Sequence, residues 1–159
     1  MKRIIVLIAI IASSISMSAQ TKSVNLELLG ANGLAGINFD TRFKGNYGFG
    51  YSVGLGYGFS STNIDFAETA GRDGVNHQAV VPVELNYLFG KHNSHFVLGA
   101  GLVGGVVINE AVKKPSFGGT AFADIAYRYQ KPKGFNFSIG MKPNLQNALY
   151  PYLSVGFSF

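Results

Sequence analysis

The clearest pattern in this sequence is an alternation of large apolar residues with small or polar ones. In residues 49–59 every odd position is large and apolar, and every even position is glycine or serine. The end of the chain follows the same rule, with Leu153, Val155, Phe157 and Phe159 alternating with Ser154, Gly156 and Ser158. Side chains two residues apart lie on the same face of a β-strand. Both segments are therefore predicted to be strands with one apolar face and one face of small side chains.

Six further segments alternate in the same way, at residues 22–30, 35–43, 77–88, 95–104, 119–129 and 135–142. Pro82 interrupts the fourth strand in chain order, 77–88, and predicts a bulge or a local break in strand pairing there. Eight is an even number, as a closed antiparallel bacterial barrel requires. The predicted fold is all-β, an eight-stranded antiparallel up-and-down transmembrane β-barrel.

The predicted connections alternate in length. Short turns are expected around 44–48, 89–94 and 130–134, a tight one at 31–34, and an intermediate one near 143–149. The two long connections are 60–76 and 105–118. Short turns on one side and longer loops on the other are typical of outer-membrane barrels. With both termini periplasmic, the long loops are expected to be extracellular.

A soluble β-sandwich also alternates, with its apolar face turned inward. Its outer face would carry water-seeking side chains, whereas residues 49–59 offer only glycine and serine, which suit a narrow interior. Aromatic residues gather near the predicted strand ends, as two membrane-interface girdles would require: Phe49, Tyr57, Phe59, Tyr87, Phe89, Phe96, Tyr127, Tyr129, Phe157 and Phe159. The membrane barrel is favoured over a soluble secreted β-domain, which stays as an alternative.

Residues 1–19 have the three parts of a secretory signal peptide. Lys2 and Arg3 precede an apolar core, and small residues lead to Ala19, after which cleavage is expected, with Ser18 as the alternative. The apolar core is short for an uncleaved membrane anchor. Residues 20–159 then form one barrel domain, and the cell outer membrane is the expected location.

Composition narrows the class further. Hydrophobic residues make up 47% of the chain, yet no stretch after residue 20 approaches the ~20 apolar residues of a transmembrane helix. Without Lys2 and Arg3, 11 of the 13 basic residues remain against 8 acidic ones, a net charge of about +3. No arginine-rich run suggests a nucleic-acid partner. The absence of cysteine excludes disulfides and thiolate metal sites.

Charged residues occupy several of the positions expected to face the barrel interior. They are four acids and three bases: Glu27, Asp40, Glu84, Asp124, Arg42, Arg128 and Lys142. Charges that share a small dry lumen should pair. We expect a hydrogen-bonded plug built around Arg42, Glu84 and Arg128. Because eight strands enclose little more than their own side chains, a diffusion pore is not expected.

Five segments carry a resemblance to known proteins: 26–34 (LELLGANGL), 37–43 (INFDTRF), 81–90 (VPVELNYLFG), 127–130 (YRYQ) and 153–159 (LSVGFSF). In these segments the sequence resembles a group of small outer-membrane β-barrel proteins common in Bacteroidetes-type bacteria. The resemblance implies a barrel built like the small adhesion and structural barrels of enterobacteria. It also implies that the final strand, with Leu153, Val155, Phe157 and Phe159, is the signal that the barrel-assembly machinery recognises. It transfers no catalytic residue.

Candidate catalytic groups are few. His92 and Ser94 have the i, i+2 spacing that resembles the lipid A deacylase pair, but they lie in a predicted periplasmic turn without a nearby acid. That turn, up to His95, is interpreted as solvated and basic, and two histidines without a third ligand are weak evidence for a metal. His77 lies at a loop edge without a matched serine and acid. Residues 99–104 match G-x-G-x-x-G, which indicates phosphate binding only between a strand and a helix.

These observations predict a monomeric, non-enzymatic barrel with a structural or surface-interaction role, without cofactor, metal or nucleic acid. Its expected partners are outer-membrane lipid and the barrel-assembly machinery. Loops 60–76 and 105–118 are the candidate contacts to lipopolysaccharide or an extracellular partner. A lipid-modifying barrel enzyme remains the other alternative.

Overall fold

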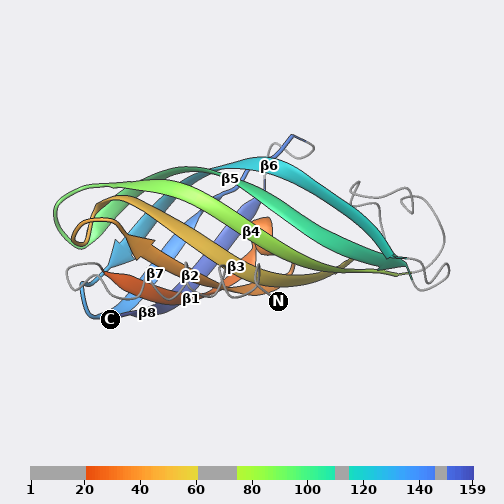
Figure 1. The fold of residues 1–159 in the computed structure, drawn as a ribbon. Helices are drawn as coiled ribbons and strands as arrows, with labels where there is room; N and C mark the ends of the chain where they lie inside the picture. The colour runs from red at the N-terminus through yellow and green to blue at the C-terminus, as the bar shows by residue number, and fades with distance from the viewer. Residues whose placement is uncertain (1–20, 61–74, 110–114, 146–149) are drawn as a thin grey trace, which may run out of the picture.

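The computed structural model describes residues 21–60, 75–109, 115–145 and 150–159, which form a closed antiparallel barrel (Figure 1). The strands are β1 (Lys22–Leu29), β2 (Ala35–Arg42), β3 (Gly48–Ser60), β4 (Asn76–Phe89), β5 (Ser94–Asn109), β6 (Pro115–Gln130), β7 (Gly134–Met141) and β8 (Pro151–Ser158). A short 3-10 helix, η1 (Gly30–Asn32), lies between β1 and β2. Within these ranges no helix has the length and apolar character needed to span a membrane.

Every strand pairs with its neighbours in the sequence, and the first pairs with the last. Antiparallel pairing of β1 with β8 joins Leu26 to Val155 and closes the barrel. The topology is therefore up-and-down, as predicted. The turns β2–β3, β4–β5 and β6–β7 lie at the end that carries the C-terminus, at the left of Figure 1. We call this end the turn end and the opposite one the loop end.

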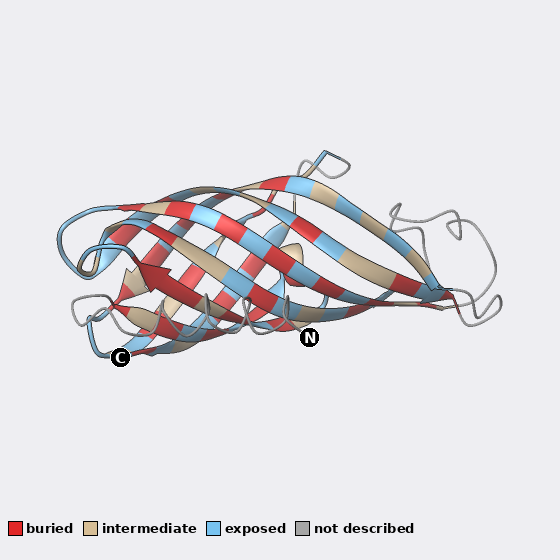
Figure 2. Ribbon diagram, viewed as in Figure 1, coloured by how far each residue is buried: buried red, intermediate tan, exposed pale blue. Residues whose placement is uncertain are grey.

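Burial alternates along the strands and follows the predicted faces (Figure 2). In β3, Phe49, Val53, Leu55, Tyr57 and Phe59 are exposed, while the glycines between them face the lumen. The lumen has no room for more there, because a Cβ at Gly50 or Gly56 would overlap atoms of inward side chains or of η1. The small inward residues of β3 therefore make space for the larger side chains of the other strands.

The wall of the barrel has two heights. Strands β1, β2, β7 and β8 have 8 residues each, whereas β5 and β6 have 16 each. At about 3.3 Å per residue and a tilt of about 40°, eight extra residues add roughly 20 Å of height. Strands β3 to β6 thus extend beyond the other four at the loop end, as Figure 1 shows.

This extension corrects the predicted loop 105–118. Strand β5 continues to Asn109 and β6 begins at Pro115, so most of that segment is strand. Gly104 pairs with Gly119 and Gly105 pairs with Gly118. Two adjacent glycines remove the side chains from both faces at once, and the alternation disappears from the sequence although the backbone stays paired.

Pro82 produces a break in pairing without a bulge. The β3–β4 register is the same before and after it, since Val53 pairs with Val83 and Gly56 with Val80, but the two rungs between them are missing. On the other side, Pro82 pairs with Val103 of β5. Proline has no N–H to give to β3, which accounts for the local gap.

The predicted signal peptide 1–19 lies outside the described residues, as do residues 61–74 of loop 60–76 and residues 110–114.

Candidate functional site: a charged network inside the barrel

All seven charged residues predicted to face the lumen are buried there. Their exposed fractions run from 0% for Arg42 to 8% for Arg128, and the full set is Glu27, Asp40, Arg42, Glu84, Asp124, Arg128 and Lys142. They come from β1, β2, β4 and β6 and from the residue that follows β7. Strand parity turns the strand residues of this set into the lumen, because every second residue of each strand points inward.

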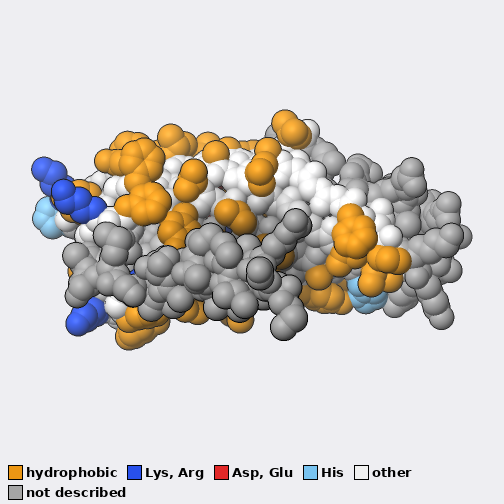
Figure 3. All heavy atoms as spheres, viewed as in Figure 1, with side chains coloured by type: hydrophobic (Ala, Val, Ile, Leu, Met, Phe, Trp, Pro, Cys, Tyr) orange, Lys and Arg blue, Asp and Glu red, His pale blue; other side chains and the backbone are white. Residues whose placement is uncertain are grey.

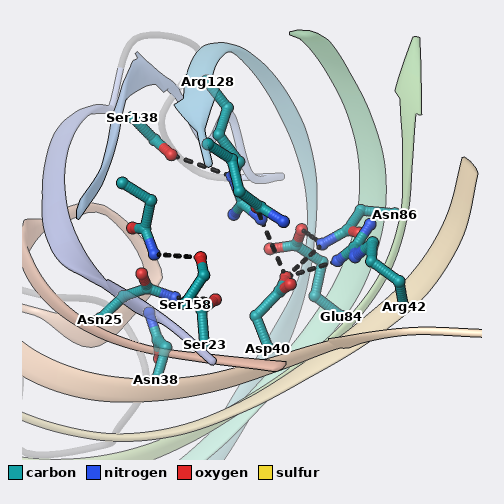
Figure 4. Close-up of polar contacts among 12 residues, drawn as sticks. Ser23, Asn25, Asn38, Asp40, Arg42, Glu84, Asn86, Arg128, Ser138 and Ser158 are labelled. Carbon is teal, nitrogen blue, oxygen red and sulfur yellow. Dashed lines mark hydrogen bonds and ion pairs between the residues drawn. The ribbon is translucent and has the colours of Figure 1, made fainter. Parts of the chain in front are cut away.

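Asp40 joins two arginines (Figure 4). Its Oδ2 atom lies 2.6 Å from Nη2 of Arg42 and 3.1 Å from Nη1 of Arg128. Arg128 also donates from Nε to the hydroxyl of Ser138 at 3.0 Å, and Arg42 donates to the carbonyl of Gly48 at 3.3 Å. One carboxylate on β2 therefore ties β6 to its own strand across the lumen. We call Asp40, Arg42 and Arg128 the arginine cluster.

Lys142 forms a second centre with two acids. Its Nζ atom lies 2.9 Å from Oε2 of Glu27 and 3.3 Å from Oε2 of Glu84. The same ammonium lies over two aromatic rings, 4.5 Å from the centroid of Tyr152 and 5.6 Å from that of Phe122. A buried cation with two carboxylates and two ring faces is well compensated. We call Lys142, Glu27 and Glu84 the lysine cluster.

Amide side chains connect these clusters. Asn86 donates to Oε1 of Glu84 at 2.8 Å and lies 3.5 Å from Oδ2 of Asp40. Asn38 donates to Oε2 of Glu27 at 2.9 Å. Neutral amides can bridge two acidic groups without adding charge, so the interior is one continuous polar network.

Among the four buried acids of the described residues, Asp124 takes part in none of these ion pairs. The phenolic hydroxyl of Tyr152 donates to its Oδ2 atom at 3.1 Å. No cation lies within ion-pair distance of Asp124 among the pairs recorded for the described residues. Its neutral partner distinguishes it from Asp40, which has the same exposed fraction of 1% but pairs with two arginines.

The centre of the network differs from the predicted one. Arg42 and Arg128 do lie together, but Asp40 rather than Glu84 is the acid that they share. Glu84 pairs with Lys142. The parity of a position gives the face of its side chain, and its place along the strand gives the depth. Neither tells which residue on another strand the side chain meets.

An apolar layer lies next to the network. Val80, Val103 and Phe122 form a buried cluster, and Ala31 of η1 packs against it. Asn32 is fully buried and donates to Oδ1 of Asn38 at 3.1 Å. The β1–β2 turn therefore folds into the barrel and fills it from the loop end. Gly30 and Gly33 have positive φ values of 65° and 79°, which permit so tight a return.

Little space remains between the charged side chains. The cavity that six of the seven charged residues line has a volume of about 10 Å³, roughly what one water molecule needs. Its walls also include Asn25, Asn38, Ser52 and Ser154.

The histidines lie in three different environments. His95 contradicts the predicted solvated turn: it is the second residue of β5, points inward and is 1% exposed. Position 95 has the same parity as inward Val97, and this parity is the sequence feature that indicates an inward side chain. His92 is exposed, and Ser94 lies 3.0 Å from the hydroxyl of Tyr127 instead. Nδ1 of His77 lies 2.6 Å from the hydroxyl of Tyr57 on the outer wall.

In the described ranges no group of three His, Cys, Asp or Glu residues could hold a metal ion.

The outer wall is apolar, whereas the interior is mostly polar. Among the described residues thirty-two large hydrophobic side chains are exposed, whereas eight hydrophobic residues are buried. Figure 3 shows apolar side chains over the wall and basic ones at the turn end. The four residues expected to form the assembly signal lie on this outer face, with Leu153 and Val155 at 38%, Phe157 at 61% and Phe159 at 55% exposure.

The fold and its interior define a class: a small, closed, eight-stranded antiparallel barrel with a charged core and an apolar wall. The N-terminal β-barrel domain of Pseudomonas aeruginosa OprF has a similar fold, with a TM-score of 0.60 and 13% sequence identity over 88% of this chain and 96% of that domain. Ail, the attachment invasion locus protein of Yersinia pestis, solved with the heparin analogue sucrose octasulfate, aligns at a TM-score of 0.47 and 12% identity over 90% of this chain and 100% of Ail. No protein-family model and no curated protein sequence matches this chain. The likeness to the OprF domain shows a shared fold and no more.

Proposed function

We propose that this protein is a barrel of the bacterial outer membrane. The proposal rests on where the side chains lie. Large apolar side chains face outward around the wall, and all seven predicted lumen charges face inward, which is the reverse of a soluble protein. In water the exposed apolar surface would be far above the few hundred Å² that monomeric soluble proteins expose in one patch. In a lipid bilayer the same wall is buried against the acyl chains. Closure of the barrel gives the backbone N–H and C=O groups of the paired strands hydrogen-bond partners.

Fractionation of cells that express the full chain tests this location. The protein should sediment with outer membranes and require detergent for extraction. A folded protein recovered from the soluble periplasm without detergent would contradict the proposal and favour the soluble β-domain.

Within the membrane we propose a structural or surface-interaction role, without transport. The lumen contents support this role, because two ion-paired clusters, an apolar layer and η1 occupy the space that a pore would need. Loops at the loop end, including residues 60–76, would meet partners outside the cell, and lipopolysaccharide is one candidate. Purified protein in planar bilayers should give no steady conductance, whereas open channels in the wild-type protein would exclude a plugged lumen.

We also propose that the chain is not an enzyme. In the candidate pair of His92 and Ser94, the hydroxyl of Ser94 lies 3.0 Å from that of Tyr127, and His92 is exposed. Lipid A from cells with and without the protein should give identical mass spectra. A mass difference equal to an acyl chain would revive the enzyme alternative.

Strand β8 is the proposed recognition element for the barrel-assembly machinery. It pairs with β7 on one side and β1 on the other, so it completes the closed sheet. Deleting Phe159 should reduce the amount of assembled barrel in cells. The same deletion should still allow refolding of the purified chain in detergent, since it removes the two backbone hydrogen bonds between Phe159 and Lys22 but leaves the pairing of β8 with β1 and β7 in place. Unchanged assembly in cells would contradict this role.

A further inference from the structure

Charge is sorted between the inside and the outside of this barrel. The described part of the chain contains four acids, Glu27, Asp40, Glu84 and Asp124, and all four are buried in the lumen. The exposed charged residues in the same part are lysines of the short turns: Lys44, Lys91, Lys131 and Lys133. Figure 3 shows basic side chains at this end of the face drawn. The exposed charged side chains at the turn end are therefore all positive in the described residues, with no exposed Asp or Glu among them.

The lysines recur at a fixed place relative to the apolar wall. Lys44 follows Phe43 directly, Lys91 follows Phe89 by two positions, and Lys133 precedes Phe135 by two. The three phenylalanines are 49%, 47% and 53% exposed, at the rim of the wall. In each turn, an aromatic ring thus ends the apolar surface and a lysine lies immediately beyond it. This is the arrangement in which lysine places its stem on apolar surface and its ammonium in the polar interface.

The positions of the lysines also limit what they can bind. They lie in the β2–β3, β4–β5 and β6–β7 turns, which are three of the four places around this end where two strands meet; the fourth, between β8 and β1, holds the ends of the chain. A single compact anion would touch one turn. Many small anions in one plane, continuous with an apolar phase, would meet all of them.

We propose that the lysine rim, Lys44, Lys91, Lys131 and Lys133, binds the phosphate headgroups of anionic phospholipids in the leaflet next to the turn end. This inference rests on the proposed membrane location and deepens it by naming a preferred lipid. The ammonium groups supply charge and hydrogen-bond donors to headgroup phosphates. The adjacent phenylalanines hold the rim at the depth where those phosphates lie.

Spin-labelled lipids provide the test. Folded full-length protein is reconstituted in phosphatidylcholine vesicles that contain a trace of spin-labelled phosphatidylglycerol or phosphatidylcholine, and the fraction of motionally restricted label is measured. The wild-type protein should select phosphatidylglycerol by about two- to fivefold, the range that an exposed ion pair gives. One molar salt should abolish the preference, because exposed charges are screened.

Two variants isolate the rim. The quadruple Lys→Gln variant at positions 44, 91, 131 and 133 should bind both lipids equally, whereas the quadruple Lys→Arg variant should keep the preference. All four substitutions lie in turns, outside the strand ladder, and circular dichroism checks the fold. A preference that survives in the glutamine variant, or is absent in the wild type, overturns the lysine rim.

Failure of the two proposals gives different results. If the wild type inserts into neutral vesicles and restricts both labels equally, the membrane location stands and the lysine rim is wrong. If the protein does not insert into vesicles of either composition, the membrane location itself is wrong.

Discussion

Replacing Asp40 with asparagine removes the acid that holds the arginine cluster together. Asp40 is 1% exposed and lies 2.6 Å from Arg42 and 3.1 Å from Arg128. In Asp40→Asn the two guanidinium groups would keep their burial and face each other without the shared carboxylate. The new amide would also present N–H donors to arginines that can only donate.

The expected loss follows from that geometry. Removing one partner of a buried ion pair costs about 3–5 kcal/mol of unfolding free energy, because the other charge stays buried. Two cations depend on Asp40, so the loss should lie at the upper end of that range. The substitution preserves side-chain volume, which keeps cavity formation out of the result.

Asp124→Asn is the matched control. Asp124 has the same exposure of 1%, but its recorded partner is the neutral hydroxyl of Tyr152, 3.1 Å away. The amide oxygen of asparagine can still accept that hydrogen bond, and the substitution keeps the side-chain volume. The expected change is at most about 1 kcal/mol, of either sign.

Urea unfolding of both variants in detergent or lipid vesicles gives the two free energies. The chain has no tryptophan, so the transition is followed by far-ultraviolet circular dichroism. Asp40→Asn within about 1 kcal/mol of the wild type would refute the reasoning, as would an equal loss in Asp124→Asn. Either result would mean that water or relaxation compensates buried charges in this lumen.

Three further changes test other parts of the interior by the same unfolding measurement. Gly54→Ala should cost about 1–3 kcal/mol by overpacking, since its Cβ would overlap an inward amide, whereas Gly104→Ala, with its nearest atom 3.8 Å away, should be neutral; equal effects would contradict the crowded lumen. Phe122→Ala should cost about 3–5 kcal/mol by opening a cavity in the apolar layer, and a loss below about 1 kcal/mol would show that η1 collapses into the gap. Lys142→Met should cost about 3–5 kcal/mol, and adding Glu27→Gln should recover part of it; additive losses would deny their coupling.

The alternation of side chains was sufficient to predict the fold. Eight strands, their inward and outward faces and their closure follow from a period of two. The boundaries of β5 and β6 did not follow, because Gly104, Gly105, Gly118 and Gly119 carry no side chain to display the period. The break at Pro82 was predictable from its missing N–H, but its restriction to the β3 side depends on which neighbour that nitrogen faces.

The residues of the charged network were predictable, but their partners were not. Parity places Asp40, Glu84 and Arg128 inside the barrel. The choice of Asp40 as partner of Arg128, and of Lys142 as partner of Glu84, depends on distances across the lumen that no local pattern contains. The inward turn at Ala31 was missed for a similar reason, since its contacts are with β4, β5 and β6.

The unequal wall heights divide the barrel into two parts with different mechanical character. Next to the turn end the sheet is a closed ring, whereas residues 115–121 of β6 pair with β5 alone in the described part of the chain. An open sheet lacks the mutual support of a ring, so its amides should exchange with solvent faster than those of residues 125–130 on the same strand. Strand β6 would then be rigid near the turn end, where the ring is closed, and more flexible towards the loop end, where it pairs with β5 alone.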